Sequence, residues 1–302
     1  MLIHTILFRR FFLLRSLTFC TLLTLMMSTS EAQTQAYCSF TFFPTILSSP
    51  NAQVFPSGVN DFGTVVGSAF TTSPTGYIEW GNGGFVFPAG TTELVDRNDK
   101  GVSIGNNGLL NAIILNGSTV TPISLTIGSN TFQFLDVEGI NNWGSIVGWY
   151  TDSAGVAHGF KRWGNGNGII LDYPAQFSGA NSGTLPTAIN DKGVVVGSTQ
   201  SPNNAFVYHN GQWATLQYPN AVSTRLNGIS NDGVIVGNAQ LADGSNQGFL
   251  YKNGVFKVVS PPNTSGQGVG SGVIGISLRN GIILGFTDFA NSPREGYVAQ
   301  CI

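Results

Sequence analysis

Four acidic residues recur in a repeated phrase of this sequence and could bind calcium. Asp61, Asp99, Asp191 and Asp232 each lie in a segment of the type Asn-Asp-x-Gly or close to it. Calcium takes about six to eight oxygen ligands, usually from several acidic side chains crowded into one loop. Each copy offers only one or two such ligands, and Asn142 stands where another copy has Asp. We interpret the phrase as turn chemistry and keep a metal loop as the alternative.

Histidines and paired carboxylates are the next candidates. A zinc site brings about four ligands to one ion. His158 and His209 are expected in different repeats and so far from each other. We therefore interpret both as polar residues at strand ends. Glycosidases use two carboxyl groups that flank the scissile bond. The acids that could approach one another for this chemistry are Asp136, Glu138, Asp152 and Asp288. We interpret these scattered acids as solvated surface residues, and we predict no metal and no cofactor.

Cys38 and Cys301 are the only cysteines after residue 32. Two cysteines in a secreted chain are more often a disulfide than two free thiols, so we predict a bond between them. Residues 1–32 have the features of a secretory signal peptide: three arginines, the apolar stretch Ser16 to Met27, and small residues in Ser30-Glu31-Ala32. We therefore predict a single secreted, periplasmic or cell-surface domain over residues 33–302, without a transmembrane segment.

The composition supports this prediction. Only 9% of the 302 residues are charged, 42% are hydrophobic and 40 are glycine, which excludes a disordered chain and favours an extracellular β fold. The net charge of −2 becomes −4 once the leader's three arginines and one glutamate are removed. Because the sequence shows no basic cluster, we predict no nucleic-acid partner and no anionic membrane surface.

Six copies of one phrase organise the rest of the chain. Asn and Asp form Asx-turns and the following glycine supplies a positive φ, so each copy predicts a tight turn. The apolar run after the turn predicts a strand covered on both faces, and its closing glycine marks a close approach by neighbouring chain. The copies are Val59 to Gly67, Arg97 to Gly105, Ile140 to Gly148, Ile189 to Gly197, Ile229 to Gly237 and Leu278 to Gly285.

Each phrase is followed by a loop, a second strand, a tight turn, a third strand that ends near a proline, and a short fourth strand. Asn210-Gly211 and Asn253-Gly254 are examples of the second turn. The closing glycines fall 38 to 49 residues apart, which is the length of a four-stranded propeller blade.

The two ends of the chain complement each other. The last repeat stops after Gly296 to Ala299 and lacks an outer strand, whereas Phe40 to Pro44 is a proline-ended strand with no repeat before it. An open solenoid would need polar capping repeats instead. The sequence therefore predicts an all-β, six-bladed β-propeller of four-stranded blades, closed by Phe40 to Pro44 beside the blade Ile276 to Ala299.

The repeats resemble the HAF family of extracellular repeat proteins, found mostly in bacteria. That family's motif runs Ile-Asn-Asp-x-Gly-x-Val-Val-Gly, a loop, His-Ala-Phe and Tyr-x-x-Gly. Ile189 to Gly197 followed by Asn204 to Gly211 matches it well, and the copies around His158 and Phe249 match with Gly in place of Ala. The resemblance covers nearly all of the chain after the leader. It implies secretion and a repeat β fold, and it brings no activity and no site residues.

Long loops on a rigid scaffold are where binding concentrates. In a propeller the loops after the Val-Val-Gly strands and the loops after the prolines share one face, called here the loop face, and the tight turns share the opposite turn face. We predict any ligand site on the loop face, where aromatic rings could stack on sugars or anchor a peptide. The candidate residues are Phe70, Trp149, Tyr150, Asp152, Phe286, Asp288 and Phe289.

Two functions remain open beside a purely architectural surface repeat, which would show neither converging ionisable residues nor aromatic binding platforms. The first is a monomeric, non-catalytic module that binds an extracellular glycan, peptide or protein. The second is a propeller-fold glycoside hydrolase or polysaccharide lyase, which needs at least two titratable groups within reach of one bond. The placement of the acids in the fold discriminates between them.

Overall fold

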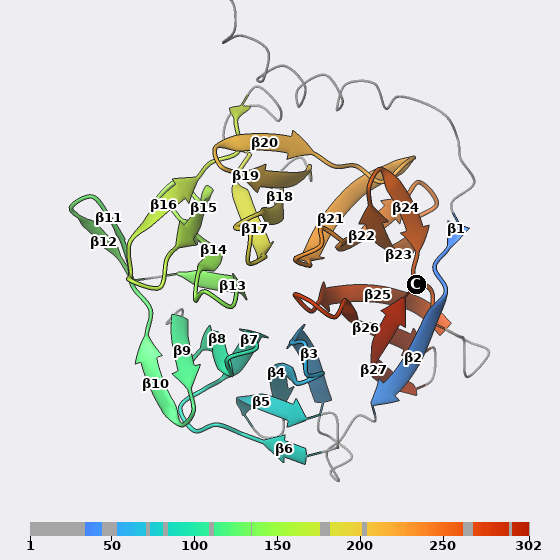
Figure 1. The fold of residues 1–302 in the computed structure, drawn as a ribbon, viewed down its shortest axis with the longest axis horizontal. Helices are drawn as coiled ribbons and strands as arrows, with labels where there is room; N and C mark the ends of the chain where they lie inside the picture. Colours follow the sequence, from blue (N-terminus) through green and yellow to red (C-terminus); the bar gives the residue numbers. More distant parts are fainter. Residues whose placement is uncertain are drawn as a thin grey trace, which may run out of the picture. The chain divides into compact units, whose positions relative to one another are not determined.

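The fold was analysed in a computed structural model of the chain. It describes residues 34–43, 53–70, 73–80, 84–108, 112–133, 135–175, 182–200, 204–261, 268–289 and 292–301. These residues form seven sheets, and six of them supply the six four-stranded antiparallel blades around a central axis (Figure 1). The prediction of an all-β, six-bladed propeller is confirmed.

Within blades 1 to 5 the strands follow in chain order from the axis to the rim. Blade 1 contains β3 (Gln53–Val59), β4 (Val65–Phe70), β5 (Pro74–Trp80) and β6 (Gly84–Val86). Blade 2 contains β7 (Glu93–Arg97), β8 (Val102–Asn106), β9 (Ala112–Asn116) and β10 (Thr119–Pro122). Blade 3 contains β13 (Asp136–Ile140), β14 (Ile146–Thr151), β15 (Ala157–Arg162) and β16 (Gly168–Leu171).

The second half of the ring repeats this order. Blade 4 contains β17 (Thr184–Ile189), β18 (Val195–Thr199), β19 (Ala205–His209) and β20 (Gln212–Thr215). Blade 5 contains β21 (Ala221–Ile229), β22 (Ile235–Leu241), β23 (Asn246–Lys252) and β24 (Val255–Val258). Blade 6 contains β25 (Gly268–Ile276), β26 (Ile282–Phe289), β27 (Ser292–Cys301) and, from the other end of the chain, β2 (Cys38–Phe43). A hairpin of β11 (Leu125–Ile127) and β12 (Asn130–Phe132) is inserted between blades 2 and 3.

Each repeated phrase ends an innermost strand, makes the tight turn and continues into the second strand of the blade. In blade 4 the Asn190 Oδ1 atom accepts the backbone N–H groups of Lys192 and Val194 at 3.1 and 3.0 Å, and Gly193 has a φ of 77°. The side chain of Asn190 therefore organises the turn, as an Asx-turn does.

The closing glycine of each phrase allows three strands of a blade to pack closely. A Cβ atom at Gly197 would lie 2.3 Å from the carbonyl oxygen of Leu185 on the innermost strand and 2.7 Å from Cζ of Phe206 on the third strand. Phe206 itself is fully buried. Any side chain at this position would force the innermost strand or the buried ring away, which is the close approach that the sequence indicated.

The N-terminal strand closes the ring. β2 pairs antiparallel with β27 along its whole length, from Cys38 opposite Cys301 to Phe43 opposite Gly296, and the two strands lie side by side in Figure 1. The rings of Phe40 and Phe42 pack against the buried ring of Tyr297, with centroids 5.2 and 6.1 Å away. The predicted closure is thus confirmed, and the strand starts at Cys38 rather than at Phe40.

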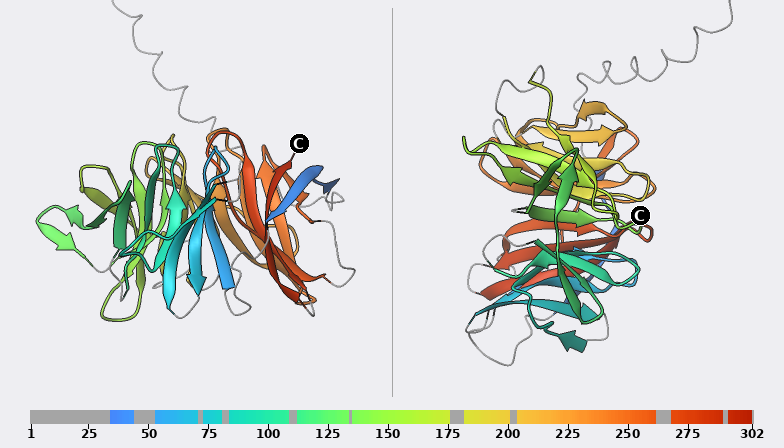
Figure 2. Two further views of the ribbon diagram at one scale, coloured as in Figure 1. Left: turned by 90° about the horizontal axis from the view of Figure 1, so that it is seen from below. Right: turned by 90° about the vertical axis from the view of Figure 1, so that its left-hand side faces the viewer.

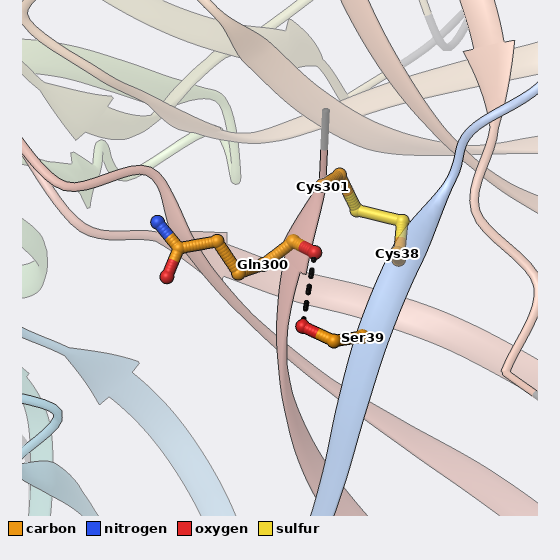
Figure 3. Close-up of a disulfide and its surroundings, with 4 residues drawn as sticks. All are labelled: Cys38, Ser39, Gln300 and Cys301. Carbon is orange, nitrogen blue, oxygen red and sulfur yellow. Dashed lines mark hydrogen bonds between the residues drawn. A yellow bond between two sulfur atoms is a disulfide. The ribbon is translucent and has the colours of Figure 1, made fainter.

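A disulfide joins Cys38 and Cys301, whose Cα atoms are 4.0 Å apart (Figure 3). The segment before it forms β1 (Thr34–Gln35), which runs parallel to β24 at the rim of blade 5. The backbone N–H of the buried Ala36 also donates to the carbonyl oxygen of Val258 at 2.8 Å. The N-terminal segment therefore covers the outer edges of two neighbouring blades, and the sequence predicted only one of these contacts.

Candidate functional site

The strands of the propeller run between two faces (Figure 2). The longest connections, among them those that follow β10, β16 and β24, lie on the loop face. The innermost strands run from the loop face to the turn face, so a residue's place along its strand decides which face it meets. Within the described parts of the chain, no helix is long and apolar enough to cross a bilayer.

Five residues on the loop-face side of blade 3 form one aromatic and acidic group, called here the blade-3 cluster: Phe132, Tyr150, Asp152, His158 and Asp172. The rings of Tyr150 and His158 stack with centroids 5.2 Å apart, and Phe132 of the inserted hairpin packs against Tyr150 at 4.9 Å. His158 Nδ1 lies 2.9 Å from Asp172 Oδ1, and its Nε2 lies 3.4 Å from Asp152 Oδ2. Of these five residues, only Tyr150 and Asp152 were predicted from the sequence as ligand-binding candidates.

The charges of the cluster act on one another. Partial burial lowers the pKa of His158, but the hydrogen bond and charge of Asp172, and then those of Asp152, more than offset it, so the pKa is raised. The pKa of Asp152 is lowered, first by the N–H of Val156 and then by those of Ala154 and the His158 ring. Because two carboxylates share one imidazole, the group stays negative whether or not the imidazole is protonated, which suits ligands that donate hydrogen bonds.

The other predicted residues lie in different places. Phe70 is exposed in blade 1 and packs edge-on against Phe55 with centroids 5.6 Å apart. Phe286 is half-buried in blade 6, where a Cβ atom at Gly272 would lie 2.7 Å from its ring. The side chains of Asp288 and Phe289 lie outside the described residues. The structure therefore brings Tyr150 and Asp152 together in blade 3, whereas Phe70 and Phe286 belong to blades 1 and 6.

Trp149 is half-buried and donates its indole N–H to the carboxylate of Glu138 on the innermost strand. Glu138 is the bulged residue of β13, because the register with β14 shifts between Val137 and Gly139. A bulge at the same position occurs in all six innermost strands, and bulges re-aim the side chain that they carry. No residue type marks these bulges, so the sequence did not reveal them.

Five of the six bulged residues line a central cavity of about 50 Å³. In blade 2 the bulged residue is Val95, and the next residue, Asp96, lines the cavity instead. Its lining includes Ser57, Asp96, Glu138, Thr187, Asn227 and Ile274, which come from all six blades. This volume suits one or two water molecules, whereas pockets for organic ligands have about 300–1,000 Å³. The interior of the channel is therefore too small for a sugar ring.

Burial raises the pKa of Glu138 and of Asp96, two of the three acids that line this cavity. The pKa of Glu138 is raised to about 7 by burial, although the Trp149 N–H opposes the rise and the charge of Asp136 adds to it. The pKa of Asp96 is raised to about 6 by burial, against the N–H groups of Ile140 and Arg97 that donate to it at 2.9 and 2.8 Å. The interpretation of Glu138 as a solvated surface acid is wrong, because the bulge aims it at the axis.

The repeated acids lie on the turn face, where they join the blades. The backbone N–H of Asp61 donates to Asp99 Oδ1, that of Asp99 to Asn142 Oδ1, and that of Asn142 to Asp191 Oδ1, at 2.8–2.9 Å. Asp191 N–H donates to Asn231 in the same way at 2.8 Å. Across the ring's closure, the N–H groups of Arg279 and Asn280 donate to Asp61 Oδ1 at 2.7 and 2.8 Å.

A second layer of hydrogen bonds lies beside this ring. The amide of Asn98 donates to Asn141 O, that of Asn141 to Asn190 O, and that of Asn190 to Ser230 O, each at 3.0 Å. The Asn-Asp pair therefore ties each blade to the next as well as closing its turn. Across the described residues, no group of three or more His, Cys, Asp or Glu side chains is placed to hold a metal ion.

Comparisons with known proteins agree on the fold. No family model and no curated protein matches the chain. TolB from Acinetobacter baumannii is similar at a TM-score of 0.50 and 12% identity, over 80% of this chain and 65% of that one. Virginiamycin B lyase from Staphylococcus aureus has a TM-score of 0.48 and 10% sequence identity, over 88% of this chain and 100% of that one. The N-terminal domain of Nup159 has a TM-score of 0.39 and 10% sequence identity, over 82% of this chain and 76% of that one. Together with the sheet topology, the match to TolB defines the class of the chain as a β-propeller, and at 12% identity it shows the fold alone.

Proposed function

We propose that this protein is a secreted, non-catalytic repeat protein of the HAF type that binds an extracellular glycan, peptide or protein. The blade-3 cluster carries the proposal. Its stacked rings offer faces for sugars or cationic groups, and its two carboxylates accept hydrogen bonds from hydroxyl or ammonium groups. The cluster lies on the face of the longer loops, where binding sites concentrate on rigid scaffolds.

Secretion is supported by two observations. The first 32 residues read as a signal peptide, and Cys38 and Cys301 form a disulfide, which persists in oxidising compartments such as the periplasm and the cell exterior. We expect the secreted chain to be a monomer.

The experiment screens the protein from residue 33 onward on glycan and peptide arrays and then measures affinity for the ligand found. Tyr150→Ala and Asp172→Asn should each weaken binding about tenfold, because each removes a stacking face or a charged acceptor. Phe70→Ala removes an exposed candidate ring from blade 1 of the same face. It therefore separates binding by the blade-3 cluster, which it leaves unchanged, from binding elsewhere on the loop face. Unchanged affinity in both cluster variants, with normal thermal unfolding, would sink the proposal.

One observation favours the second candidate function, a glycoside hydrolase or polysaccharide lyase. The carboxyl of Glu138, with its pKa raised to about 7, has the property of a general acid at neutral pH. The small cavity around it argues against this function. New reducing or unsaturated chain ends formed by the wild-type protein, and lost in Glu138→Gln, would establish the enzyme and remove the non-catalytic proposal.

A further inference from the structure

The tips of the six inner turns form a ring of exposed residues around the axis on the turn face. Each tip residue follows the residue whose hydrogen bond joins its turn to a neighbouring turn. Consecutive tips are therefore neighbours in space. Cationic tips alternate with the others. In ring order the tip residues are Phe62, Lys100, Trp143, Lys192, Asp232 and Arg279, and all six are exposed. We call these six residues the tip ring.

The two aromatic tips are unusually exposed for their size. The exposed fraction is 75% for Phe62 and 69% for Trp143. Trp163, at the adjacent outer turn of blade 3, is 39% exposed. A single exposed apolar residue needs no explanation, but several aromatic rings on one face commonly mark an interaction site.

Trp143 is held in a fixed position. Its indole N–H donates to the carbonyl oxygen of Asp191 at the next turn, at 3.1 Å. The Lys100 Nζ atom lies over its ring, 5.4 Å from the centroid. The indole therefore bridges two neighbouring turns, with an ammonium group beside it and most of its surface in solvent. Such a ring is pre-organised for stacking, so binding costs little side-chain entropy.

The cations of the protein gather at this end of the strands. Those with described side chains at the turn ends are Arg97, Lys100, Lys161, Arg162, Lys192, Lys252 and Arg279, whereas Arg225 and Lys257 lie toward the loop face. The described acids toward the loop face are Glu93, Asp136, Asp152, Asp172 and Asp243. Although the net charge of the chain is small, positive charge is concentrated at the turn face and net negative charge at the loop face. The amino-acid composition alone does not show this separation. Such a field steers anions toward the turn face.

The acids on the turn face are largely engaged within the protein. Asp61 accepts two backbone N–H groups, and Asp191 accepts the amide groups of Asn142 and Asn231 at 3.1 and 2.8 Å. Asp232 pairs with Lys252 at 2.5 Å. The second carboxylate oxygen of Asp61 is buried without a hydrogen-bond partner. The side chains of Lys100, Lys192 and Arg279, by contrast, are exposed to solvent.

We propose that the tip ring is a binding surface for an acidic polysaccharide. The ring of Trp143 stacks on a sugar face, and Lys100, Lys192 and Arg279 bind its carboxylate or sulfate groups through charge-assisted hydrogen bonds. An anionic membrane is the less suitable partner, because an indole tied to the neighbouring turn by its own N–H does not insert between lipids as a free tip would. This surface is independent of the blade-3 cluster, which lies on the opposite face.

The test measures retention of the protein from residue 33 onward on immobilised polygalacturonate, with neutral dextran as the reference matrix. Wild-type protein should be retained at low ionic strength and released as salt screens the charges. Affinity should fall at least about tenfold in Lys100→Gln/Lys192→Gln/Arg279→Gln, since three charged contacts are lost. Trp143→Ala should weaken binding about tenfold through the loss of the stacking face.

Arg225→Gln is the matched control, because it removes one positive charge from the opposite end of the ring and should leave retention unchanged. Trp143→Phe keeps a stacking face and should bind better than Trp143→Ala, which separates stacking from a general loss of structure. The proposal is overturned if the wild type is not retained, or if the triple variant is retained equally. Binding to vesicles rich in phosphatidylglycerol without binding to polygalacturonate would also overturn it.

Discussion

At the scale of single residues, the acids of this protein take three different roles that the sequence does not separate. Asp152 and Asp172 face solvent and hold His158, Asp61 and Asp99 join blades, and Glu138 lies in the central cavity. All are acids beside apolar runs in the sequence. What separates them is burial, which costs an ionised carboxyl its hydration and so raises its pKa.

Glu138 should make the stability of the protein depend on pH. Its pKa in the folded protein is about 7, above the ordinary value of 4.5, so the folded state binds more protons between these values. The stability that Glu138 confers is therefore greatest below about pH 4.5 and is lost as the pH rises toward 7. We predict that Glu138→Gln is about as stable as the wild type at pH 5. At pH 8 it should be more stable by up to about 3 kcal/mol, measured by denaturant unfolding.

Asp243→Asn is the control for this prediction. Asp243 lies in the exposed turn between β22 and β23, and the Ser245 side chain and N–H lower its pKa. Asp243→Asn should therefore be no more stable than the wild type at pH 8. A Glu138→Gln variant whose advantage does not grow between pH 5 and pH 8 would contradict the assignment of Glu138 to the cavity.

At the scale of elements, the phrase predicted the turns and strands because its chemistry is local. Asn-Asp-x-Gly specifies a turn through hydrogen bonds within about five residues, and the apolar run specifies a covered strand. The hairpin β11–β12 and the strand β1 were not predicted. Each is short and has no counterpart in the other repeats. The strand β1 also depends on pairing with Lys257 and Val258, which lie more than 200 residues away in the sequence.

The bulges explain why the candidate site was only partly predicted. Trp149 was named as a loop-face residue, yet its indole meets Glu138 because the register shifts between Val137 and Gly139. Phe132 and Asp172 were missed because they reach Tyr150 and His158 from other strands. Such contacts are set by pairing across the sheet, which a single sequence does not display.

Two glycine substitutions test whether the closing glycine of the phrase is needed for space or for backbone freedom. Gly197→Ala places a methyl group 2.3 Å from the Leu185 carbonyl oxygen, so we expect it to lower the free energy of unfolding by at least about 3 kcal/mol. Gly211 has a φ of 82° and open space around it. Gly211→Ala should therefore cost only the backbone strain, about 1–2 kcal/mol.

Denaturant unfolding of both variants gives the comparison. If both variants lose the same free energy of unfolding, the innermost strand moves aside readily at Gly197. Close packing of the three strands would then not be the reason that the position requires glycine.

At the scale of the whole molecule, the ring has one seam, where β2 from the N-terminus completes blade 6. The sequence predicted this seam because each end of the chain lacked what the other supplied. We predict that deleting residues 37–43 abolishes cooperative thermal unfolding. The deletion uncovers the edge of β27, and an exposed strand edge is prone to pair with other chains. It also removes the rings that cover Tyr297, which is fully buried.

The deletion also removes the disulfide, so the strand and the cross-link must be separated. Cys38→Ser/Cys301→Ser keeps the strand and loses only the bond, which spans 263 residues. Loop entropy gives roughly 5 kcal/mol as the upper value for its contribution, so this variant should unfold cooperatively at a lower temperature. If closure depends on strand pairing, the deletion must be far more damaging than the double serine variant. If instead the deletion melts like the wild type, blade 6 is stable with three strands and the ring does not depend on its N-terminus.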